Sequence, residues 1–178
     1  MRLIACLAAL SFSLPALAAE PCRDAPLPAE PWTSWNQSGA ATAAGELTST
    51  PRLILGKPIV ATLRPSAQVQ YPVKPERQEA KSYGGLFSLA VKTQARIGIG
   101  LSGPAWVDIV TNDIPVASAA HGHGEECSGI QKIVWFDLTP GVHIIQLSGS
   151  TASQLRIMAA DELANQPLPP RMPDPFNP

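Results

Sequence analysis

The sequence has few charged side chains and no block of one sign. Lys and Arg number 13 and Asp and Glu number 14, so the formal net charge is −1. A nearly neutral chain without a basic run lacks the electrostatic attraction that nucleic acids and anionic membranes exert on their protein partners. We therefore expect no nucleic-acid partner, and an unidentified ligand or envelope protein instead.

The chain also lacks an apolar run long enough to cross a membrane. The run at residues 3–14 is shorter than the roughly 18 apolar residues that a span requires. Arg2 precedes it and Ala16-Leu17-Ala18 follows it. This pattern is typical of a secretory signal peptide cleaved after Ala18 or Ala19. It predicts a leader at residues 1–18 and a periplasmic or secreted mature chain without a membrane span.

Cysteine is scarce, with three residues in the chain. Cleavage of the leader would remove Cys6 and leave Cys22 and Cys127. An even number of cysteines in an oxidising compartment predicts one disulfide between these two. The alternative is a pair of free thiols in which Cys127 serves as a metal ligand.

Helical periodicity is absent beyond the leader, and a period of two takes its place. Apolar side chains alternate with small or polar ones in several short segments, each typical of a half-buried strand; among them are Phe87, Leu89 and Val91, then Ile97, Ile99 and Leu101, and later Val134, Phe136 and Leu138. Thr139-Pro140-Gly141 fits a type II turn between two such segments. The pattern predicts an all-β fold, an antiparallel, jelly-roll-like β-sandwich of about eight to nine strands, with a closed barrel as the alternative.

The same patterns suggest how the chain is divided. The sandwich domain is expected at residues 52–160, after an irregular arm at residues 19–51 and before a proline-rich tail at residues 161–178 that cannot build a core. Trp32 and Trp35 in the arm could be buried anchors or exposed stacking groups. The first role is the expectation.

The segment at residues 121–127, His-Gly-His-Gly-Glu-Glu-Cys, is the leading candidate for chemistry. His121 and His123, two positions apart, would lie on the same side of an extended strand, where both could bind one transition metal. Glu125 and the distant His143 could complete the site, as could Glu126 or Cys127. The spacing matches no closed zinc motif, and the glycines favour a solvated loop. The metal site is therefore one hypothesis and the plain loop is the other.

Other candidates are less specific. Asp108, Asp113 and Asp137 could act as acid and base, or lie in turns and on solvent faces. The glycines of Gly98-x-Gly100-x-x-Gly103 match a dinucleotide fingerprint by chance, since no helix follows them. Four aromatic residues could form a sugar-stacking platform or belong to the core; these are Tyr71, Tyr83, Trp106 and Trp135.

Several of these segments carry a family resemblance. It covers roughly residues 53–159 and depends on Ser82-Tyr83-Gly84-Gly85-Leu86, Ala105-Trp106-Val107-Asp108-Ile109-Val110, the loop at 121–127, Ser128-Gly129-Ile130-Gln131-Lys132 and Leu138-Thr139-Pro140-Gly141. The chain resembles small exported alphaproteobacterial (sphingomonad-type) proteins often named homogentisate 1,2-dioxygenase. Its rhythm of strands is also similar to prepeptidase C-terminal β-sandwich domains.

The dioxygenase name implies an iron site of two histidines and a glutamate. His121, His123 and Glu125 or Glu126 could mimic it. In the cupin motif of such enzymes, however, the glutamate stands four or five residues beyond the second histidine, where this chain has Cys127 and Ser128. No catalytic role is therefore carried over.

These observations favour an exported, non-catalytic β-sandwich that acts as a binding or accessory protein of the periplasm or envelope. The alternatives are a metal-binding protein or non-haem iron dioxygenase-like enzyme that uses the His121 and His123 loop, and a carbohydrate-binding module.

Overall fold

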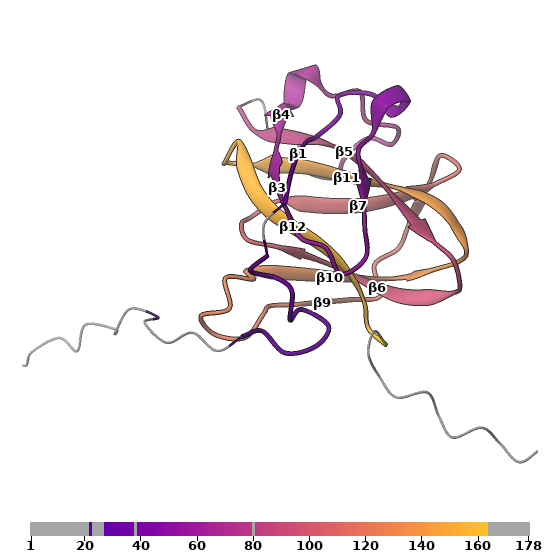
Figure 1. Cartoon of the computed structure of the whole chain (residues 1–178). Coiled ribbons are helices and arrows are strands. Elements are labelled where there is room, and N and C mark those ends of the chain that lie inside the picture. The colour runs from indigo at the N-terminus through magenta and orange to yellow at the C-terminus, as the bar shows by residue number, and fades with distance from the viewer. Residues whose placement is uncertain (1–21, 23–26, 38, 80, 164–178) are drawn as a thin grey trace, which may run out of the picture.

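The computed structural model describes residues 22, 27–37, 39–79 and 81–163. The predicted leader and nearly all of the predicted tail lie outside these residues. The described chain is built almost wholly of β-strands, which form two six-stranded sheets (Figure 1). The predicted all-β sandwich is confirmed. None of the described helices is long and apolar enough to span a membrane.

The two sheets, named here sheet A and sheet B, are formed by segments from the whole chain. Sheet A has the order β1 (Ala40–Thr42), β3 (Ile59–Thr62), β12 (Gln154–Asp161), β6 (Ala95–Leu101), β10 (Lys132–Leu138) and β9 (Ala120–Gly122). Sheet B has the order β2 (Arg52–Leu53), β5 (Tyr83–Val91), β11 (Gly141–Ser150), β7 (Trp106–Thr111) and β8 (Ile114–Val116), with β4 (Arg64–Pro65) also paired to β5. Two single-turn 3₁₀ helices, Leu47–Ser49 and Ser66–Gln68, lie between strands.

Two details of the predicted fold are wrong. The described residues form twelve strands rather than eight or nine, because several strands are only two or three residues long and show no alternation. The sheets are mixed rather than antiparallel, since β1 pairs with β3 and β2 pairs with β5 in parallel. The structure also places strand β1 at Ala40, within the segment predicted as an irregular arm.

The main core lies between the sheets and follows the predicted alternation. Phe87 and Leu89 of β5 are fully buried, as are Ile97 and Ile99 of β6. Burying one large apolar side chain contributes roughly 1.5–3 kcal/mol. This core therefore supplies most of the driving force for folding and holds the two sheets together.

A second apolar cluster covers the outer face of sheet A. Trp32 and Trp35, from residues 27–37, pack on Ile133 and Met158, and Figure 1 shows this indigo segment beside β10. Both indoles are nearly inaccessible, with exposed fractions of 6% and 2%. The prediction that they are buried anchors is confirmed.

Two glycines of β6 make room for this cluster. The inward positions of β6 are apolar, whereas Gly98 and Gly100 face outward. A Cβ on Gly100 would lie 2.7 Å from Cζ3 of Trp32, and one on Gly98 would lie 2.7 Å from Cζ3 of Trp135. The two indoles meet edge to face with ring centroids 5.9 Å apart. Glycine at positions 98 and 100 therefore leaves the space that the two indole rings occupy.

Polar contacts and a disulfide fasten the same segment. The Arg156 guanidinium donates hydrogen bonds to the carbonyls of Trp35, at 3.0 Å, and Gln37, at 2.6 Å. Cys22 and Cys127, 105 positions apart, form a disulfide, as predicted. Arg156 thus ties residues 27–37 to β12. The disulfide ties Cys22, which precedes them, to the loop at residues 121–127, here called the histidine loop.

We expect Gly100→Ala to lower the free energy of unfolding by about 1–3 kcal/mol, because the added methyl group must displace the Trp32 ring from a well-packed site. Urea denaturation of both proteins measures the change. Gly103→Ala is the matched control, since nothing lies within 4 Å of a Cβ at Gly103. Equal effects of the two substitutions would contradict the role given to Gly100.

Replacing both cysteines, in Cys22→Ser/Cys127→Ser, should also destabilise the fold. A loop of about 100 residues closed by a disulfide is worth up to roughly 4–5 kcal/mol in the chain-entropy model, and measured values are often smaller. Urea denaturation under non-reducing conditions gives the loss. Intact-mass measurement of the wild type should show two hydrogens fewer than the reduced chain, and a full-mass chain would disprove the bond.

Candidate functional site

The histidine loop begins in an edge strand and lines a hollow at the side of the sandwich. His121 lies in β9 opposite Val134 of β10, and His123 follows directly after the strand. The ring of His123 donates from Nδ1 to the carbonyl of Gln131 at 2.7 Å. Both rings are exposed and line one hollow of about 350 Å³ together with Gly103, Pro104, Gly122, Gln131 and Lys132, here called the histidine hollow. Their predicted placement on one side of a strand stays a prediction, since β9 ends at Gly122.

His143 is engaged elsewhere. It lies on the inner face of β11 with 1% of its surface exposed. Its Nε2 donates to the carbonyl of Thr139 at 2.9 Å, so in the neutral ring Nδ1 accepts from the Thr111 hydroxyl at 2.7 Å. Glu125 is exposed beyond Gly124, and Cys127 is in the disulfide. Among the residues that the structure describes, no three His, Cys, Asp or Glu side chains gather as metal ligands would. The four-residue metal site stays a prediction.

A second hollow, which the sequence did not indicate, lies between the two sheets. Strand β8 pairs only with Ile109–Thr111 of β7, so the preceding residues of β7 form an uncovered edge of sheet B. Here the sandwich opens into a cleft of about 390 Å³, here called the inter-sheet cleft. Its lining is Glu76, Trp106, Val107, Asp108, Val116, Ala117, Ser118, His121, Lys132, Val134 and Phe136. The deepest of these, Val107, Val134 and Phe136, belong to the main core.

Asp108 and Glu76 are the acidic groups of this cleft, and the Asp108 side chain reaches it from the outer face of sheet B, where it contacts Gln146. Trp106 donates from Nε1 to one carboxylate oxygen at 2.9 Å, and the Gln146 amide donates to the other at 3.0 Å. Burial raises the pKa of Asp108, and the negative charge of Glu76 adds to this, while the two hydrogen bonds and Lys132 act against it. Each carboxylate oxygen therefore already accepts one hydrogen bond from within the protein.

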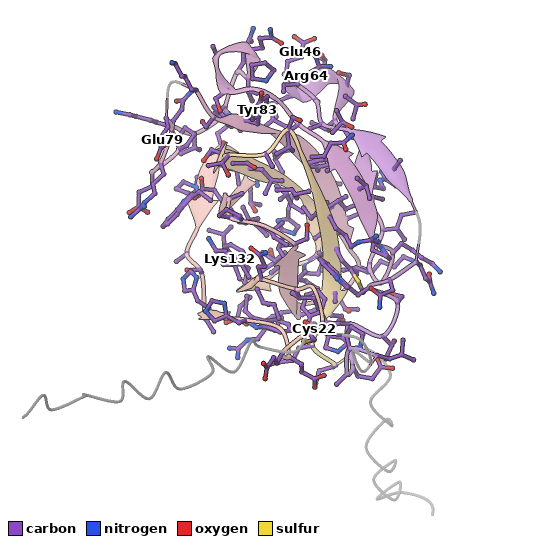
Figure 2. All side chains as sticks on the ribbon, turned by 90° about the vertical axis from the view of Figure 1, so that its left-hand side faces the viewer. Cys22, Glu46, Arg64, Glu79, Tyr83 and Lys132 are labelled. Atoms are coloured by element: carbon purple, nitrogen blue, oxygen red, sulfur yellow. A yellow bond between two sulfur atoms is a disulfide. The ribbon has the colours of Figure 1, made fainter. Side chains whose placement is uncertain are left out.

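Lys132 is the basic group and bridges the sheets. From the start of β10 in sheet A, its ammonium donates to the carbonyl of Ala105 at 2.9 Å and lies 5.2 Å from the ring centroid of Trp106. Burial lowers the pKa of Lys132, and the nearby Arg77 lowers it further, whereas Asp108 raises it. Figure 2 shows Lys132 at a level between Glu79 and the disulfide at Cys22.

A third hollow adjoins the other two. It measures about 380 Å³, is here called the arginine hollow, and is lined by Arg77, Glu79, Pro104, Ala105, Trp106, Lys132, Gly149 and Thr151. The Arg77 guanidinium lies 5.9 Å from the Trp106 ring centroid. Lys132 lines all three hollows, and Trp106 lines the inter-sheet cleft and the arginine hollow. The candidate site is therefore centred on Lys132 rather than on the histidine pair.

The other predicted candidates are dispersed. Trp135 packs against Trp32 on the outer face of sheet A, whereas Trp106 belongs to sheet B. Tyr71 donates a hydrogen bond to the carbonyl of Leu147 on sheet B, and Tyr83 packs partly buried against the main core. The four aromatic residues therefore do not form one stacking surface.

The two remaining carboxylates occupy ordinary surface positions. Asp137 forms an exposed ion pair with Arg96 at 2.8 Å, and this contact lowers the pKa of Asp137. Asp113 lies in the turn between β7 and β8 with a positive φ of 62°. Neither lines the cleft, so Asp108 alone of the three belongs to the candidate site.

No family model matches this chain, and no curated protein matches it closely enough to count as related. The resemblance to exported proteins named homogentisate 1,2-dioxygenase stays a prediction.

The raised pKa of Asp108 leads to a pH-dependent prediction. Folding favours the neutral form of this carboxyl, so its contribution to stability is complete below the pKa of the unfolded chain and is lost as pH rises through the higher pKa of the folded state. The stability of the wild type relative to Asp108→Asn should therefore fall as pH rises from about 4 and then level off. Urea denaturation at a series of pH values measures it.

Asp137→Asn is the control with the opposite sign. Because the pKa of Asp137 is lowered in the folded state, its contribution is present above the unfolded-state pKa and is lost as pH falls. Wild type relative to Asp137→Asn should therefore gain stability as pH rises. A pH profile of the same sign for both variants would contradict the environment described for Asp108.

Proposed function

We propose that this protein is an exported, non-catalytic binding protein of the periplasm or cell envelope, which holds a small ligand in the inter-sheet cleft. One observation carries the proposal: a cleft with Val107, Val134 and Phe136 in its wall is also lined by two charged groups, Asp108 and Lys132, whose pKa values burial shifts in opposite directions. Ligand sites typically combine an apolar lining with a few polar groups of perturbed pKa.

The two charged groups are held in fixed positions, as the groups of a binding site are. Both oxygens of Asp108 accept hydrogen bonds from within sheet B, and Lys132 is fastened to the carbonyl of Ala105. Polar groups held in fixed positions are what a binding site needs to orient its ligand.

The disulfide supports the proposed location. Structural disulfides persist in oxidising compartments such as the bacterial periplasm and are rare in the cytosol. The bond between Cys22 and Cys127 fits a mature chain exported by the predicted leader.

A metal-binding role, which would include a dioxygenase-like enzyme, is the second candidate. It is favoured by His121 and His123, which line one hollow. Lys132 lines the same hollow, and its positive charge opposes a cation there. The inter-sheet cleft is therefore the stronger site.

A small-molecule fragment library of neutral, acidic and basic compounds tests the proposal by ¹H–¹⁵N NMR. We expect hits to shift the indole N–H signal of Trp106 and the amide signals of Val107 and Val116. Val116 is half-buried at the cleft, so Val116→Phe should fill the space and weaken these hits by about tenfold or more, the effect of losing about 1.4 kcal/mol.

Ile54→Phe is the matched control, because Ile54 lines a different hollow. It should leave the affinities unchanged. Hits that shift only signals around Ile54, or a library without hits, would overturn the proposal.

A further inference from the structure

The ammonium of Lys132 has unused hydrogen-bond donors at the centre of the site. It carries three N–H groups, and the described residues give it one acceptor, the carbonyl of Ala105. The ion pairs found among the described residues involve Arg96 only. Lys132 is thus a half-buried cation without an ion-pair partner in the described part of the chain.

Arg77 brings a second positive charge to the same ring. Its guanidinium and the Lys132 ammonium lie 5.9 Å and 5.2 Å from the Trp106 ring centroid. Both cations line the arginine hollow, so an anion bound in that hollow would be attracted to both. Glu79 also lines the arginine hollow but forms no ion pair of its own within the described chain.

The acidic groups around Lys132 are Asp108 and Glu76, which line the inter-sheet cleft, and Glu79, which lines the arginine hollow. Asp108 already accepts one hydrogen bond at each oxygen, from Trp106 at one and from Gln146 at the other. A ligand cation would compete with these donors, whereas a ligand anion at Lys132 would not. The free N–H groups of Lys132, with Arg77 beside them, therefore favour an anionic head group at this position.

The apolar part of a ligand has a place beside this anion position. Trp106 and Lys132 line both the arginine hollow and the inter-sheet cleft. A molecule whose head lies at Lys132 can therefore extend past the indole onto Val107, Val134 and Phe136. These three side chains provide an apolar surface without a hydrogen-bonding group.

We propose that the ligand is a small amphipathic anion, with a carboxylate or phosphate head held by Lys132 and Arg77 and an apolar body held in the inter-sheet cleft. This inference rests on the proposed function and specifies the chemistry of its ligand. Lys132 supplies a point charge with free donors, and Arg77 supplies the planar fork that suits both head groups.

Four eight-carbon probes test the head group separately from the body: octanoate, octyl phosphate, octan-1-ol and octylamine. In NMR titrations of the full mature chain, we expect at least one anion to bind about tenfold or more tightly than octan-1-ol, and octylamine to bind most weakly. The tighter of the two anions identifies the head group. The Trp106 indole signal should shift with both anions.

Charge variants place the head group. Lys132→Met should weaken octanoate binding by about tenfold or more and leave octan-1-ol unaffected, whereas Lys132→Arg, which keeps the charge, should retain most of the affinity. Lys92→Met is the matched control, because Lys92 is an exposed lysine that lines a different hollow. An unchanged Trp106 spectrum and unfolding temperature in the free variants show that the fold is intact.

The outcomes separate the two proposals. Octan-1-ol that binds in the cleft as tightly as the anions, or octylamine that binds more tightly, overturns the anion inference while the proposed function stands. Binding of all four probes around Ile54 instead of Trp106 overturns both. Anion binding that Lys132→Met and Lys92→Met weaken equally also overturns the inference, because the head would then respond to net charge alone.

Discussion

Two apolar sheet faces packed against each other hold this molecule together, and the rest of the structure depends on that contact. Phe87 and Ile145 of sheet B and Ile99 of sheet A are completely buried between the sheets. This packing fixes the separation of the sheets. It therefore sets the distance that Lys132 must span from sheet A to reach Ala105 and Trp106 beside sheet B. The candidate site exists because one long side chain can cross that gap.

Sheet A carries a second apolar face, which would otherwise meet water. The segment at residues 27–37 covers it, with Trp32 packed over Gly100 and Trp35 held by Arg156. The disulfide joins the same segment to Cys127, at the end of the histidine loop. That loop is also closed by its own backbone, through hydrogen bonds from Gly124 to Ile130 and from Ser128 to Glu125. The arm thus stabilises both the outer face and one border of the site.

The outer face of sheet B carries an apolar cluster around Leu86 and, beside it, a strip of polar side chains on β11. Gln146 and Ser148 are fully buried on β11, and within the described chain Oε1 of Gln146 and Oγ of Ser148 have no hydrogen-bond partner. Asp108 and Trp106 lie opposite them on β7. Burial of such groups is costly unless they are paired, and it is the burial of Asp108 that raises its pKa. The raised pKa of Asp108 therefore comes from its burial beside the polar side chains of β11.

The sequence by itself determined the class of fold, because the alternation of apolar and polar side chains is a local pattern. It favoured the disulfide over free thiols and buried roles for Trp32 and Trp35 over exposed ones, and the tertiary structure decided both. It predicted His121 and His123 on one side of a strand, whereas strand β9 ends at Gly122. It could not determine the mixed pairing of two- and three-residue strands, which have too few residues to show a pattern. Only the tertiary structure decided that Lys132 is the centre of the site. Lys132 and Trp106 are far apart in the sequence and belong to different sheets, and no local pattern records which side chains meet across the gap between them.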